Sequence, residues 1–107
     1  MKMRHFLSLL LFSVLLSACG AVQSGGDVEQ GRQALLAGNY QAALGNFQNA
    51  EKADPNYVYG TEIREGVSSY LGRAQYLTGN YAQARQTLEK ALSQHRGDNL
   101  ARSTGQN

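Results

Sequence analysis

The feature that most constrains the fold of this 107-residue chain is a pattern of small and aromatic residues that occurs twice. Each copy reads Gly-x6-Gly-Asn-Tyr-x2-Ala-x3-apolar-x2-Ala, beginning at Gly31 and again at Gly72. A glycine readily takes the left-handed conformation that ends a helix, and an asparagine after it can cap the next helix. The pattern therefore predicts two helix-turn-helix hairpins, with turns at Gly38 and Gly79.

The helix after each turn carries apolar residues at helical spacing, with polar residues on its other side. The apolar positions are Ala43, Leu44, Phe47 and Ala50 in the first copy, and Ala84, Leu88, Ala91 and Leu92 in the second. We expect these faces to form the core between hairpins, and the polar faces to be solvated.

The two copies resemble the tetratricopeptide repeat, a helix-turn-helix unit of about 34 residues that stacks into solenoids. Leu71-Gly72 reproduces the Leu-Gly pair of that repeat, and Pro55 follows the first copy as the family's helix-terminating proline does. The resemblance covers residues 24–98. It implies an all-α fold, a short α-solenoid of two repeats, with a truncated third repeat as an open alternative.

The spacing between the copies is longer than in the family, since Gly38 and Gly79 are 41 positions apart. The excess of about seven residues lies around 56–62. We expect a lengthened loop followed by one extra helical turn that begins near Thr61. The second copy has no proline after its last helix, and Gly97 is the predicted stop.

The domain boundaries follow from these signals. Asp27 is predicted to cap the first helix, with Gln30 three residues later in a capping box. The helical domain is then 27–98, and its two copies span about 27–55 and 61–96. Residues 99–107 form either a polar tail or the start of an incomplete third repeat.

Repeat units bury their apolar faces only on their neighbours, so two repeats alone make a small core. Completion by self-association or by a partner is one interpretation. A product cut short at the third repeat is the other.

The amino-terminal segment has the pattern of an export signal. Lys2 and Arg4 precede an apolar run at 6–16, which is shorter than the about 20 residues that span a membrane. Leu16-Ser17-Ala18-Cys19 resembles the lipobox of bacterial lipoproteins. We therefore predict a signal peptide at 1–18, with an ordinary signal peptide and an incidental cysteine as the alternative.

The lipobox resemblance implies that cleavage leaves Cys19 as the first residue, acylated and inserted in a lipid membrane. Residues 19–26 would then be the lipidated cysteine and a flexible tether. The mature chain would be exported and anchored at the periplasmic face of the envelope. By analogy with Gram-negative lipoproteins, Gly20 in place of aspartate implies the outer membrane.

Charge and composition argue against several other functions. Of ten basic residues, Lys2 and Arg4 lie in the signal segment, so eight basic residues balance eight acidic ones in the remainder. We therefore expect no nucleic-acid partner. His95 is the one histidine beyond the signal segment and Cys19 the one cysteine, so we expect no metal, no cofactor and no enzymatic activity.

Ligands of the tetratricopeptide family usually lie in the concave groove formed by the first helices of successive repeats. Transferring these positions gives Val28, Arg32, Leu35 and Leu36 in copy one, and Ser69, Arg73, Tyr76 and Leu77 in copy two. Arg32 and Arg73 each follow the repeat glycine, so together they could grip an acidic side chain or a terminal carboxylate. The preferred alternative is that each arginine pairs with a neighbouring acid, such as Glu29 for Arg32.

These patterns predict a membrane-anchored scaffold lipoprotein that binds a protein partner in the bacterial envelope, with a role in assembly or secretion. The alternative is a truncated or degenerate product that is exported and lipidated but has no binding function of its own.

Overall fold

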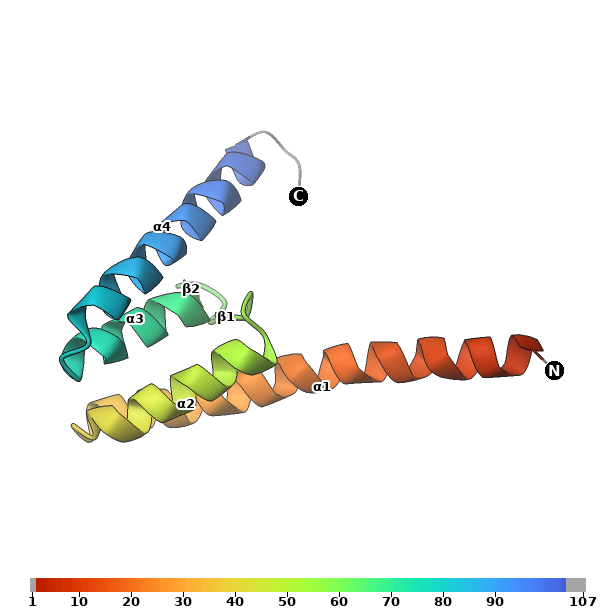
Figure 1. Cartoon of the computed structure of the whole chain (residues 1–107). Coiled ribbons are helices and arrows are strands. Elements are labelled where there is room, and N and C mark those ends of the chain that lie inside the picture. The colour runs from red at the N-terminus through yellow and green to blue at the C-terminus, as the bar shows by residue number, and fades with distance from the viewer. Residues whose placement is uncertain (1, 104–107) are drawn as a thin grey trace.

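The computed structural model describes the backbone of residues 2–103, and side chains within 19–97 and 99–100. Over this range the elements are α1 (Lys2–Leu36), α2 (Tyr40–Ala53), β1 (Val58–Tyr59), β2 (Glu65–Gly66), α3 (Val67–Leu77) and α4 (Tyr81–Ser103). Figure 1 shows two helix hairpins, α1 with α2 and α3 with α4. The predicted all-α solenoid of two helix-turn-helix repeats is confirmed.

The two helix turns have the predicted left-handed glycines. Gly38 has a φ of +77° and Gly79 a φ of +85°. In both turns the backbone N–H of the following asparagine donates to a carbonyl near the end of the first helix. Asn39 donates to the Ala34 carbonyl at 2.9 Å, and Asn80 donates to the Gln75 carbonyl at 2.8 Å.

The caps of the two second helices differ. Asn39 accepts a hydrogen bond from the Ala42 amide at 3.2 Å, as predicted for a helix cap. The side-chain amide of Asn80 instead donates to the Thr78 hydroxyl at 2.9 Å.

The core lies around α2, which packs between α1 and α3. Ala43, Phe47 and Ala50 are fully buried along its predicted apolar face. The Phe47 ring stacks on Tyr70 of α3 with centroids 5.3 Å apart, which joins the two hairpins. Val28, predicted to face the groove, is instead fully buried in this core.

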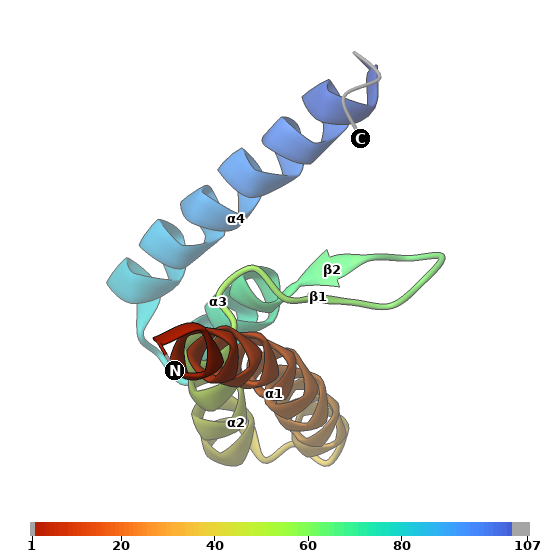
Figure 2. The same ribbon diagram turned by 90° about the vertical axis from the view of Figure 1, so that its right-hand side faces the viewer.

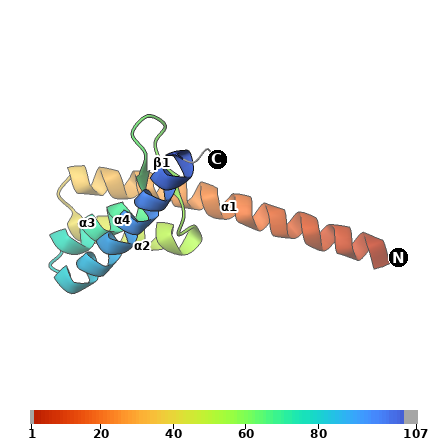
Figure 3. The same ribbon diagram turned by 90° about the horizontal axis from the view of Figure 1, so that it is seen from above.

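The predicted flexible tether at 19–26 and the helix start at Asp27 are wrong. Helix α1 is continuous from Lys2 to Leu36, so neither Asp27 nor Gln30 caps it. The segment is ordered by packing on α2, because the Ser24 hydroxyl is fully buried and donates to the Ala50 carbonyl at 2.5 Å. Figure 3 shows α1 running past the other helices toward its amino terminus.

The inserted residues between the repeats form a β-hairpin, not an extra helical turn. β1 and β2 are antiparallel, with Tyr59 opposite Glu65. Gly60 has a φ of +97°, a conformation that favours glycine, and helix α3 begins at Val67 instead of near Thr61. Figure 2 shows this hairpin extending sideways from the helices.

The last helix also differs from its prediction. α4 continues through Gly97, so that residue does not stop it, and residues 99–103 are helical. Residues 104–107 of the predicted tail lie outside the described part. None of the described helices contains an apolar stretch long enough to cross a membrane.

Candidate protein-binding groove

A pocket between the first helices of the two hairpins unites most of the predicted groove. Its lining residues are Arg32, Leu35, Leu36, Tyr40, Glu65, Tyr70, Arg73 and Leu77. Residues from α1 and α3 therefore meet on one surface, as the transferred positions imply. Leu36 is 89% exposed at its edge, which leaves an apolar side chain open to solvent.

Besides the buried Val28, two predicted groove residues, Ser69 and Tyr76, lie outside this pocket. The Ser69 hydroxyl donates to the Glu65 carboxylate at 2.8 Å, beside the β-hairpin. Tyr76 packs edge-on against Tyr81 with ring centroids 5.3 Å apart, at the turn between α3 and α4. Neither side chain is available to the pocket in this arrangement.

Two tyrosines of the pocket were not predicted as groove residues. Tyr40, the first residue of α2, lines the pocket from the turn between α1 and α2. Tyr70 precedes the Leu71-Gly72 pair and is largely buried. Its position one helical turn before Arg73 could have indicated the pocket.

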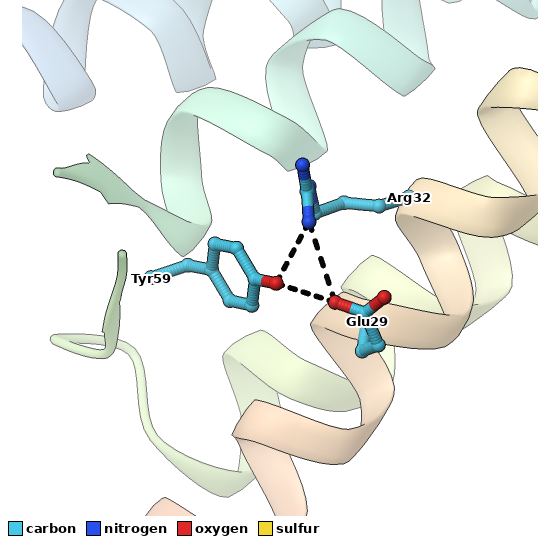
Figure 4. Close-up of polar contacts among 3 residues, drawn as sticks. All are labelled: Glu29, Arg32 and Tyr59. Atoms are coloured by element: carbon cyan, nitrogen blue, oxygen red, sulfur yellow. Dashed lines mark hydrogen bonds and ion pairs between the residues drawn. The ribbon is translucent and has the colours of Figure 1, made fainter. Parts of the chain in front are cut away.

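Arg32 belongs to a three-residue cluster that ties α1 to β1 (Figure 4). Its guanidinium donates to the Tyr59 hydroxyl at 2.7 Å and lies 3.3 Å from the Glu29 carboxylate. The Tyr59 hydroxyl in turn donates to Glu29 at 2.5 Å. The guanidinium also lies 4.5 Å from the centre of the Tyr59 ring. The preferred prediction, that Arg32 pairs with Glu29, is confirmed.

The contacts in this cluster shift the pKa values of the Glu29 carboxyl and the Tyr59 phenol. The hydrogen bond from Tyr59 lowers the pKa of the Glu29 carboxyl below its ordinary value, and the Arg32 charge acts in the same direction. The same hydrogen bond to Glu29 raises the pKa of Tyr59. A charged Glu29 and a neutral Tyr59 are therefore the favoured forms in the fold.

Arg73 makes an equivalent connection to the other strand. Its guanidinium is hydrogen-bonded to the Glu65 carboxylate in β2 and lies 5.4 Å from the centre of the Tyr70 ring. Glu65 faces Tyr59 across the hairpin. The two arginines therefore hold opposite strands of one β-hairpin against the end of the groove.

The pairing decides what the groove can bind. Each arginine already has a carboxylate partner, so an incoming anion gripped by both would compete with Glu29 and with Glu65. The unpaired part of the surface is apolar and is formed by Leu35, Leu36 and Leu77. The arrangement suits an apolar protein segment better than a free carboxylate. Among the described side chains, no group of histidine, cysteine and acidic residues could hold a metal ion.

The fold and groove define a short helical-repeat scaffold. A family model described as tetratricopeptide repeat matches residues 34–104, from the last turn of α1 through α4. The chain belongs to the tetratricopeptide repeat family. No curated protein and no solved structure matches it. Repeats of this family generally mediate protein–protein interaction and are typically non-catalytic scaffolds.

Proposed function

We propose that this chain is a scaffold lipoprotein of the bacterial envelope that captures a protein segment in the groove between α1 and α3. The observation that carries the proposal is the shared pocket, in which Arg32, Leu35 and Leu36 of one repeat meet Arg73 of the next. Family membership supplies the class of ligand, and the open apolar edge supplies a place for it.

The chemistry of the groove defines the kind of segment. Leu35, Leu36 and Leu77 would receive apolar side chains, and desolvation of their surfaces would drive binding. The arginines would keep the hairpin in place and offer hydrogen bonds at one end. The proposed role is assembly or secretion in the envelope.

Membrane anchoring through Cys19 is the second part of the proposal. The lipobox-like sequence and the apolar run before it support acylation, and the Cys19 side chain is exposed. Several acyl chains hold a protein firmly, because each buried methylene adds about 0.8 kcal/mol. The periplasmic face of the outer membrane is the proposed location if the cell is Gram-negative.

Site-specific photocrosslinking in the producing cell tests the groove. A photoreactive residue at Leu36 is expected to give one discrete protein adduct, whereas the same residue at Gln86, exposed on α4, gives none. Leu77→Glu is expected to reduce the Leu36 adduct about tenfold or more, because an apolar segment that covers a carboxylate must remove its water.

Two outcomes would count against the groove. Identical adducts from Leu36 and Gln86 would show nonspecific contact. No adduct from a folded chain at the membrane would favour a degenerate product without a binding function. Anchoring is tested separately, since Cys19→Ser is expected to release the chain from the membrane fraction and remove the acyl mass.

A further inference from the structure

Among the described side chains, packing on α2 begins directly after Cys19. A Cβ atom at Gly20 would lie 2.8 Å from the Ala53 carbonyl oxygen, so the backbones of α1 and α2 touch at this point. One turn further along, Ser24 is fully buried against Ala50. No free segment separates the exposed cysteine from the first contact of the core.

This continuity removes the freedom that a tether would give. Neighbouring Cα atoms are about 3.8 Å apart, so Gly20 cannot lie far from an acylated Cys19. Glycine and serine residues at 20–26, which in an unstructured tether allow reorientation, are here part of a packed helix. An anchor at Cys19 therefore holds α1 directly.

Helix α1 then sets which parts of the molecule approach the lipid. The carboxyl end of α2 and the turn at 54–56 lie beside the amino-terminal end of the packed region, because Gly20 contacts Ala53. The turn between α1 and α2 lies at the opposite end (Figures 1 and 3). Leu36 follows Cys19 by 17 positions, which corresponds to about 25 Å along a helix.

We infer that the acylated chain stands on the membrane in a fixed orientation, with the turn at 54–56 against the lipid headgroups and the groove directed into the aqueous space. The inference rests on the proposed anchoring at Cys19. It gives the groove a set height above the membrane, so that a partner reaches Leu36 from the aqueous side.

Lipid-headgroup quenching tests this orientation with the acylated mature chain. Cys19 is the one cysteine in the sequence and its thiol would be blocked by acylation, so a new cysteine takes a fluorophore selectively. Asn56→Cys and Ala37→Cys place the probe on exposed residues at the two ends of α2. The vesicles contain phosphatidylethanolamine, phosphatidylglycerol and a headgroup-nitroxide lipid. We expect several-fold stronger quenching at position 56 than at position 37.

A spacer variant is the matched control. A flexible Gly/Ser insertion of about ten residues between Cys19 and Gly20 keeps the anchor and is expected to abolish the difference between the probes. Equal quenching of both probes in the acylated chain without the spacer would overturn the orientation and leave the anchoring proposal intact. Absence of acyl mass on Cys19 would overturn the anchoring proposal, and the orientation with it.

Discussion

The two helix hairpins carry the same pattern of residues but bury it to different depths. Phe47 of α2 is fully buried, whereas Leu88, at the equivalent position of α4, is 40% exposed. α2 lies between α1 and α3, while α4 packs chiefly on α3. The comparison shows that burial in a repeat depends on the number of neighbouring helices as much as on the residue.

The small residues beneath these two side chains extend the comparison. A Cβ at Gly31 would lie 2.3 Å from the Phe47 ring, and one at Gly72 would lie 2.5 Å from a methyl group of Leu88. Both helix pairs thus approach closely at a glycine. The buried ring has no room to move, but the half-exposed leucine can rotate toward solvent.

The largest expected difference comes from truncating the two equivalent side chains. Phe47→Ala is expected to lower the free energy of unfolding by about 3–5 kcal/mol, because it removes a fully buried ring and leaves a cavity. Leu88→Ala is expected to cost about 1–2 kcal/mol, since part of that side chain is already in water. Urea unfolding followed by circular dichroism measures both. Phe47→Leu keeps the test measurable if the alanine variant does not fold, and equal losses would contradict the comparison.

Adding a methyl group at the two glycines should give a smaller difference. Gly31→Ala is expected to destabilise the fold by about 1–3 kcal/mol through overpacking against Phe47. Gly72→Ala should cost less than about 1 kcal/mol, because Leu88 can yield and alanine favours a helix. In a Phe47→Leu background, Gly31→Ala should lower the free energy of unfolding by less, because the smaller leucine leaves room for the added methyl group. Fully additive effects of that pair would mean that the two residues do not clash.

The smallest expected effect on stability comes from the two equivalent arginines, because only Arg32, in the first repeat, pairs with Tyr59 and Glu29. The folded pKa of Glu29 is lowered, so the stabilisation from its charge is complete above its ordinary value of 4.5 and lost as the pH falls through the folded pKa. Tyr59→Phe is expected to weaken this acid-dependent step, observed by NMR at the residues of β1. Tyr57→Phe, in the same segment, is the control. A pH response unchanged by Tyr59→Phe would rule out the hydrogen bond between Tyr59 and Glu29 as its cause.

Much of the fold could be predicted because the turns use local chemistry. Gly38 and Gly79 are needed where the backbone is left-handed, and that requirement is visible in the sequence. The pocket was partly predictable for the same reason, because Arg32 and Arg73 follow equivalent glycines. The position of Ser69 could not be predicted, because its hydroxyl donates to Glu65 in a β-hairpin that the sequence pattern did not indicate.

The segments that were predicted wrongly depend on tertiary contacts. Residues 19–26 have the composition of a flexible tether, but the small residues Gly20, Ser24 and Gly31 lie on one helical face and admit α2. A segment rich in glycine and serine is found both in flexible tethers and where two helices approach closely, and local propensity does not distinguish the two cases. Their spacing of four and then seven positions was the available signal.

The one-sided packing of α4 gives the molecule a direction of unfolding. Cooperativity in a linear array passes only through shared interfaces, and α4 shares fewer of them than α2. Fraying of α4 leaves the buried contacts around Phe47 in place, whereas opening α2 removes contacts from both α1 and α3. Opening therefore starts at α4 and proceeds toward α1, so the last structure to melt is the hairpin that contains Cys19.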